Sequence, residues 1–203
     1  TGGQDTVGVR VPNHPVALGL LEAFARVGGR GVAAPSANRF GNVSPTTAQA
    51  VADELGDYLA ESDQILDGGA CDVGVESTII DCTGSIPKIL RPGAITEQMI
   101  SGSSGLEAMG VVEKSAIRVS GSLEVHYAPA ATVILDQSPV AGQGFIALAD
   151  VATPDGVIRL AAPQTHQEFA RVLYAALRAA DDQGVAVVVV QQPAGDGIAI
   201  AIR

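Results

Sequence analysis

The chain has 203 residues, 47% of them apolar, and its 12 basic and 22 acidic residues give a net charge of −10. This composition supplies a hydrophobic core and excludes an intrinsically disordered chain, while the negative charge opposes strong direct binding to a nucleic-acid backbone. Aromatic residues make up only 3%, with no Trp, which leaves few side chains that could stack on nucleic-acid bases. The longest aliphatic run, residues 185–190, is too short for a membrane span.

In the N-terminal part, alternating apolar residues predict strands, and turn-forming residues separate them from two helices. The expected elements are, in order, a strand at 7–11, a helix from Val16 to the Gly28-Gly29 stop with Asn13 as its N-cap, a strand at 31–34, a polar loop at 35–44, a helix at 46–58 with Ser44 as its cap, and a strand at 64–66.

In the rest of the chain, a hairpin precedes a regular alternation of strands with one helix. The expected elements are strands at 76–82 and 87–90 joined by the turn 83–85, a helix at 97–100 capped by Thr96, a flexible segment at 101–105, little structure up to residue 129, strands at 132–135, 145–148 and 157–160, a helix at 164–180, and a strand at 185–190. The last five of these predict a small α/β unit with a mostly parallel sheet. We therefore divide the chain into residues 1–118, a linker at 119–131, and a second domain at 132–203.

The two cysteines, Cys71 and Cys82, form no CxxC motif and have no paired histidines nearby. This spacing predicts neither a disulfide nor a metal site and fits the reducing cytoplasm. The sequence contains no phosphate loop of the GxxxxGK or GxGxxG type, no HExxH motif and no nucleophile elbow. His14 and His166 are unpaired, so nothing predicts a hydrolytic triad. A site in this chain would act by positioning and electrostatics.

The polar loop begins with Ala34-Pro35-Ser36-Ala37-Asn38, where a predicted strand ends. Ligands of open α/β sheets bind in such loops, and Ser36 and Ser44 bracket this one. The alternative is that Ser36 and Asn38 only satisfy the loop backbone and that Ser44 only caps a helix.

Arginines accompany these hydroxyl groups. Arg91 follows Ser77 by fourteen residues, and a hairpin of that length can bring its guanidinium close to the Ser36 loop, where it would bind phosphate or carboxylate. Arg10 shares one face of the first predicted strand with Thr6. Two arginines beside a serine-lined loop favour an anionic ligand, although each alone is also typical of an exposed strand residue. Tyr127 can close over a nucleotide or pin two domains together.

Together, these motifs resemble the threonylcarbamoyl-adenylate synthase family in its long form, a YrdC-like domain followed by a smaller C-terminal domain. The resemblance rests on five motifs in family order: DTVGVRVP at 5–12, APSAN at 34–38, GVEST at 74–78, LRPG at 90–93 and HYAP at 126–129. It implies an α/β fold, with part of a YrdC-like twisted mixed sheet with helices and then a small Rossmann-like α/β domain.

The resemblance also implies a reaction. In this family ATP, L-threonine and bicarbonate give threonylcarbamoyl-adenylate and pyrophosphate, normally with Mg²⁺, and partner proteins transfer the product to tRNA. It implies that Thr6, Ser36, Asn38, Ser44, Arg91 and Tyr127 bind the nucleotide, that Arg10, Ala34 and Ser77 bind threonine, and that Arg10, Ser36 and Arg91 are the residues closest to the chemistry. No protein metal site, no strong nucleic-acid binding and no membrane association are expected.

The family pattern begins upstream of Thr1, with a threonine-binding segment and a Lys-x-Arg motif that this sequence lacks. We therefore expect an N-terminally truncated piece that forms little or no adenylate alone. Two alternatives stay open. One is a carbamoyl-adenylate-forming YrdC-like module of hydrogenase maturation, against which residues 126–203 count. The other is a non-catalytic nucleotide-binding module.

Overall fold

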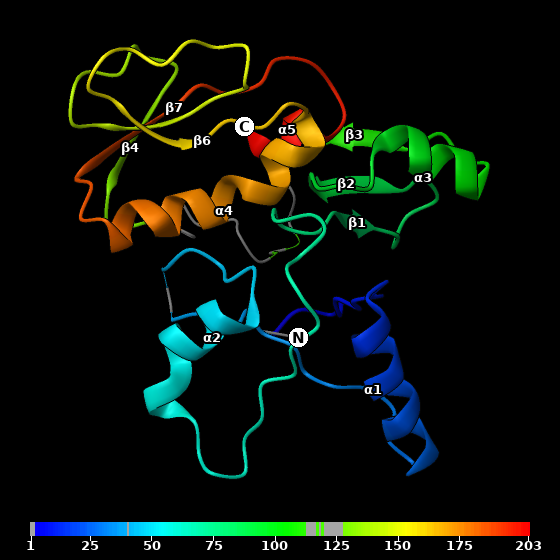
Figure 1. The fold of residues 1–203 in the computed structure, drawn as a ribbon. Coiled ribbons are helices and arrows are strands. Elements are labelled where there is room, and N and C mark those ends of the chain that lie inside the picture. Colours follow the sequence, from blue (N-terminus) through cyan, green and yellow to red (C-terminus); the bar gives the residue numbers. More distant parts are fainter. Residues whose placement is uncertain (1–2, 40, 113–116, 118, 120–127) are drawn as a thin grey trace.

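The computed structural model describes residues 3–39, 41–112, 117, 119 and 128–203. Its elements, in chain order, are α1 (Pro15–Arg26), α2 (Ala48–Leu55), the 3-10 helix η1 (Gly56–Tyr58), β1 (Ile79–Asp81), β2 (Lys88–Arg91), α3 (Glu97–Ser104), β3 (Met109–Val111), β4 (Thr132–Leu135), β5 (Gly144–Ile146), β6 (Ile158–Ala161), α4 (His166–Asp182), β7 (Val187–Val190) and α5 (Ile198–Ile202). The two sheets lie in the upper part of Figure 1, α1 and α2 lie below them, and α4 runs between the larger sheet and α2. The predicted α/β class is confirmed.

Both predicted N-terminal helices form, with shifted starts. Helix α1 begins at Pro15, one residue before the predicted start at Val16, and its N-cap is His14, one residue after the predicted cap Asn13. Gly28, with φ +92°, follows its end. Helix α2 is capped by Thr47, whose hydroxyl accepts a hydrogen bond from the Ala50 amide, so Ser44 is not its cap. Its predicted last turn is the 3-10 helix η1.

The strands predicted at 7–11, 31–34 and 64–66 do not form. Most of their apolar side chains are exposed: Val7, Val9 and Val11 retain 69%, 78% and 87% of their accessible surface. No backbone hydrogen bond joins these segments to another described residue. Alternation along the sequence indicates a strand only where a partner supplies the ladder, and the described residues supply none.

The predicted hairpin forms one edge of a mixed three-stranded sheet. β1 pairs antiparallel with β2, so that Ile79 lies opposite Arg91, and β2 pairs in parallel with β3. Asp81 shapes the turn, because its Oδ1 accepts hydrogen bonds from the Thr83 amide and hydroxyl at 2.9 and 2.7 Å. These bonds lower the pKa of the Asp81 carboxyl group.

The segment predicted as flexible, 101–105, forms the second half of α3 and its C-cap. Thr96 caps this helix as predicted, and Gly105, in the left-handed region at φ +70°, ends it. The expectation of little structure up to residue 129 is also wrong at β3. Residues 109–111 show no alternation, and they become a strand because β2 offers a parallel partner.

The C-terminal unit has the predicted parallel sheet, in the order β4-β7-β5-β6. Apolar residues recur along one side of α4 and pack on this sheet, and Phe169, Ile146 and Val188 are fully buried between them. The predicted strands and helix are confirmed to within three residues at each end, and α5 is an addition. The Arg159 side chain connects several segments of this unit, because it donates hydrogen bonds to the carbonyls of Ala147, Leu148, Val151 and Ala161.

Helix α4 also joins the two parts of the chain. Val43 and Val75, from the N-terminal part, pack in the same core cluster as Phe169 and Leu173 of α4. Gly74 lies directly against the helix, so that a Cβ atom at this position would lie 2.6 Å from the carbonyl oxygen of Ala170. Among the described residues, no helix combines the length and apolar composition needed to cross a bilayer.

Candidate functional site

Four residues predicted from separate motifs, or adjacent to them, meet in one polar cluster. Ser44 donates from its hydroxyl to Glu76 Oε1 at 2.9 Å, and Arg91 Nη2 lies 3.6 Å from Glu76 Oε2. Arg91 also donates from Nε and Nη2 to the Ser77 carbonyl oxygen, at 3.0 and 2.8 Å, and its Nη2 lies 3.4 Å from Ser77 Oγ. We call Ser44, Glu76, Ser77 and Arg91 the Arg91 group.

The hairpin register positions this group. Arg91 is the last residue of β2 and pairs with Ile79, two residues after Ser77, so its side chain folds back over residues 76–77. Gly93 permits the close approach, because a Cβ atom there would lie 2.7 Å from the Glu76 carbonyl oxygen and would overlap the Thr78 amide. Thr78 holds the segment that follows β2, since its hydroxyl donates to Ile95 O and accepts from Ile95 N.

The Arg91 group is largely buried and contains one positive and one negative side chain. The Arg91 side chain is 13% exposed and that of Glu76 is 20% exposed. A guanidinium beside two serines suits phosphate or carboxylate, and such an anion would compete with Glu76 for it. The sequence reasoning assigned no role to Glu76, although it stands next to Ser77 as the carboxylate of the GVEST motif.

Asn38 lies at the start of the second feature, loop 38–44, which is described except at residue 40. Asn38 Nδ2 donates to the carbonyls of Arg39 and Asn42 at 3.0 and 2.8 Å, which fixes the amide orientation. Its Oδ1 is buried and has no hydrogen-bond partner among the described residues. Asn38 therefore shapes the loop and holds one unsatisfied acceptor.

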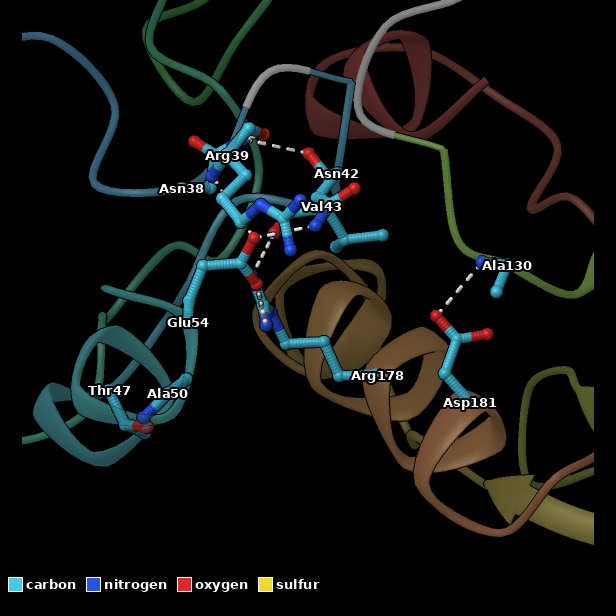
Figure 2. Close-up of polar contacts among 10 residues, drawn as sticks. All are labelled: Asn38, Arg39, Asn42, Val43, Thr47, Ala50, Glu54, Ala130, Arg178 and Asp181. Atoms are coloured by element: carbon cyan, nitrogen blue, oxygen red, sulfur yellow. Dashed lines mark hydrogen bonds and ion pairs between the residues drawn. The ribbon is translucent and has the colours of Figure 1, made fainter. Parts of the chain in front are cut away.

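Glu54 of α2 holds the same loop from below, as Figure 2 shows. Its Oε1 accepts hydrogen bonds from the Arg39 amide at 3.0 Å and from Asn42 Nδ2 at 2.6 Å, and its Oε2 pairs with Arg178 Nη1 of α4 at 3.1 Å. Burial acts to raise the pKa of the Glu54 carboxyl group, but these hydrogen bonds and the Arg178 charge outweigh it and keep the pKa below 4.5. Sequence reasoning found neither Glu54 nor Arg178, because no local motif marks them.

The other predicted site residues lie apart from these contacts. Arg10, Ala34 and Ser36 are exposed and Thr6 is half-buried. Across the described ranges, no hydrogen bond or ion pair joins Thr6, Arg10 or Ser36 to the Arg91 group. Tyr127 lies outside the described residues, as do most of the predicted linker and the predicted boundary at residue 118.

A cavity of about 140 Å³ lies beside the Arg91 group, between the β2–α3 segment and α5. Pro92, Gly93, Ile95 and Ile200 give it a mostly apolar wall, with Glu97 and Asp196 at its polar side. It contains none of the predicted site residues. Among the residues that the structure describes, no group of three His, Cys, Asp or Glu side chains is arranged to hold a metal ion.

Two family models together match the whole chain. Residues 1–93 match the model described as Telomere recombination, and residues 94–203 match the model described as Threonylcarbamoyl-AMP synthase, C-terminal domain. The second match covers more than half of the chain.

Individual relatives carry the same name. The threonylcarbamoyl-AMP synthase of Bacillus subtilis is 34% identical over 100% of this chain and 62% of its own length, and that of Pyrococcus abyssi is 35% identical over 100% and 63%. A third, from Schizosaccharomyces pombe, is 40% identical over 66% of this chain and 34% of its own length. The chain thus spans less than two thirds of the length of the curated relatives it matches.

Solved structures show the same likeness. The crystal structure of P. abyssi Sua5 complexed with L-threonine superposes with a TM-score of 0.79 at 34% identity, over 100% of this chain and 63% of that one. A doubly substituted variant of P. abyssi Sua5 gives 0.78 at 32% identity, over 99% and 62%.

Proposed function

This chain belongs to the threonylcarbamoyl-AMP synthase family, and from that premise we propose that it is part of an enzyme that makes L-threonylcarbamoyl-AMP and pyrophosphate from ATP, L-threonine and bicarbonate. The observation that carries this proposal is the unbroken likeness along all 203 residues to proteins named as threonylcarbamoyl-AMP synthases. The Arg91 group supports it, because it offers a cation and two hydroxyl groups to an anionic ligand.

We assign the nucleotide to residues around loop 38–44. Arg91 binds phosphate, and Ser44 and Asn38 lie at the two ends of the loop. The half-buried Thr6, the exposed Ser36 and Tyr127 complete the set. L-threonine is assigned to Arg10, Ala34 and Ser77, with the Arg10 guanidinium pairing with the substrate carboxylate. The half-buried contact between Arg91 and Ser77 supports adjacent sites for the two substrates.

The chemistry needs no enzyme nucleophile. The threonine amine takes up carbon dioxide derived from bicarbonate and loses a proton, which gives a carbamate. A carbamate oxygen attacks the α-phosphorus of ATP, the bond from that phosphorus to the bridging oxygen breaks, and pyrophosphate leaves with the electron pair. The residues bring the reactants in line and neutralise developing charge. Arg91 does this by exchanging Glu76 for a phosphate oxygen, with Arg10 and Ser36 placed at the reacting groups.

We include Mg²⁺ in the proposal as an ion that arrives with ATP. Mg²⁺ is commonly held by substrate phosphates and water with only one or two carboxylates, so the donor set described here fits delivery by ATP. The carboxylate within the Arg91 group is Glu76. When bound, Mg²⁺ supplies charge neutralisation on the phosphates.

The proposal extends to partners and compartment. The product is consumed by proteins that transfer the threonylcarbamoyl group to tRNA, and the net charge of −10 supports leaving the tRNA itself to them. Cys71 and Cys82 are both free thiols, which supports a reducing compartment such as the cytoplasm.

The test is pyrophosphate release by the full-length protein that contains these 203 residues, with ATP and bicarbonate and in the presence of L-threonine or of L-serine. We expect release that depends on threonine. Adenylate formation that does not respond to threonine would favour the hydrogenase-maturation type of chemistry, and ATP binding without any release would favour a non-catalytic nucleotide-binding module. Either result would overturn the proposed function.

A further inference from the structure

Two polar side chains on α4 reach back to two different segments outside the C-terminal unit. Arg178 and Asp181 are three residues apart and therefore lie on one side of the helix. Figure 2 shows Arg178 directed at loop 38–44 and Asp181 directed at the chain that enters β4. The helix that forms the core of the second unit thus also contacts the loop proposed to bind nucleotide.

Arg178 makes two separate contacts with this region. Its Nη1 donates to Glu54 Oε2 at 3.1 Å, and its Nη2 donates to the carbonyl oxygen of Val43, inside the loop. The side chains are 20% exposed for Arg178 and 8% for Glu54, so water screens this pair weakly. Because the other Glu54 oxygen accepts from Arg39 and Asn42, this carboxylate connects α4 to two positions of the loop, and Arg178 itself adds a third at Val43.

Asp181 holds the end of the predicted linker beside the same loop. Its two oxygens accept hydrogen bonds from the amides of Ala130 and Ala131, at 3.0 and 2.9 Å. The Ala128 amide then donates to the Gly41 carbonyl at 2.9 Å, which joins the linker end to loop 38–44 directly. The loop, the linker end and α4 therefore form one hydrogen-bonded unit.

We propose that Glu54 and Arg178 are positioning residues that set the conformation of loop 38–44, so that the second α/β unit takes part in binding the nucleotide. This inference rests on the proposed function, which places ATP at that loop. Neither side chain belongs to the Arg91 group, and both act through the loop backbone at Arg39 and Val43 and through Asn42. The contact depends on the shape of the guanidinium, because two of its nitrogens donate to two acceptors that lie apart, the Glu54 carboxylate and the Val43 carbonyl. A single ammonium nitrogen does not match this arrangement.

The experiment compares Arg178→Met with Arg171→Met in the full-length protein that contains these 203 residues. Arg171 is on the same helix, two turns earlier, and it is exposed. No hydrogen bond or ion pair joins its side chain to the described residues of loop 38–44. Met keeps the side-chain length and the helix propensity in both variants. We expect the KM for ATP to rise about tenfold in Arg178→Met, because displaced binding groups lose their alignment. The KM for threonine and the parameters of Arg171→Met should stay at the parent values.

Two further variants keep the test decisive if Arg178→Met unfolds. Glu54→Gln keeps an acceptor for Arg39 and Asn42 and loses only the charge that pairs with Arg178, so it should raise the KM for ATP without a large loss of thermal stability. Arg178→Lys keeps the charge but cannot make both contacts at once, so we expect it to restore only part of the ATP affinity. A purely structural role would instead lower the midpoint temperature of unfolding, with both KM values unchanged.

The outcomes separate this inference from the proposed function. Threonine-dependent pyrophosphate release by the parent protein is measured first, and its absence overturns both. If the parent is active while Arg178→Met and Glu54→Gln keep the ATP KM of the Arg171→Met control, the proposed function stands and the positioning role is wrong.

Discussion

Arg91 binds a carboxylate, a carbonyl and a hydroxyl of its own chain, and the same guanidinium is assigned to phosphate. We expect Arg91→Ala to weaken ATP binding by about 1.5 to 3 kcal/mol, the range for a charge-assisted hydrogen bond. Glu76→Gln is the matched variant, because it keeps an acceptor for Ser44 and removes the charge that competes with phosphate. It should bind ATP as well as the parent or more tightly. Titration calorimetry measures both. A loss of affinity in both variants would mean that the group acts only as a structural unit.

Glu54 makes the loop sensitive to acid. Its folded pKa is depressed, so the stabilisation it provides is fully present above the pKa of about 4.3 that an unfolded Glu has, and it is lost as the pH falls through the lower folded value. The free energy of unfolding of the parent should therefore fall more steeply than that of Glu54→Gln as the pH decreases below 4.5. Urea unfolding at a series of pH values measures this difference, and parallel curves would contradict it.

At the scale of elements, the contact between Gly74 and α4 sets how closely the two parts of the chain pack. Gly74→Ala would force the segment and the helix apart, since the new Cβ overlaps the Arg171 carbonyl, and we expect a loss of about 1 to 3 kcal/mol. Gly102→Ala is the control: it lies within α3 with no atom near its Cβ position, and it should stabilise by about 0.5 to 1 kcal/mol. Thermal unfolding compares them. Equal effects would show a loosely packed contact.

Elements with local signals were predictable, and those that depend on distant partners were not. Thr96 before Glu97 marks the start of α3, and the turn at 83–85 between two apolar runs marks the hairpin. The run at 7–11 has an equally clear alternation, yet it forms no strand, because alternation does not report whether a partner exists. β3 is the opposite case. Its three residues show no alternation that predicts a strand, and they form one because they pair with the neighbouring β2.

The same distinction applies to the candidate site. Turn residues predicted the hairpin, and its length was expected to bring Arg91 near the Ser36 loop. Among the described residues, Arg91 instead contacts Ser77 and Glu76, and Glu76 accepts a hydrogen bond from Ser44 at the far end of that loop. Glu54 and Arg178 are 124 residues apart, and each is an ordinary charged residue on an amphipathic helix. Only the packing of α4 against α2 and loop 38–44 brings them together, and no local pattern contains that information.

At the scale of the whole molecule, side-chain burial and backbone hydrogen bonding are distributed unevenly. The parallel sheet and α4 contain most of the large apolar side chains that are buried, whereas residues 7–11, 31–34 and 64–66 have no backbone partners among the described residues. In hydrogen exchange of the 203-residue chain, we expect amides of β5 and β7 to exchange slowest and those three segments to exchange within the dead time. Slow exchange at 7–11 would mean that this segment pairs in solution.

The contact between α4 and loop 38–44 has a consequence for biosynthesis. At translation rates of about 5 to 20 residues per second, roughly 6 to 25 s pass between the emergence of Glu54 from the ribosome and that of Arg178. During that interval, water takes the place of the Arg178 guanidinium at the Glu54 carboxylate and at the Val43 carbonyl. The loop is thus completed only after α4 has emerged. A nascent polypeptide that stalls before α4 would carry every residue of the Arg91 group without the helix that holds the neighbouring loop.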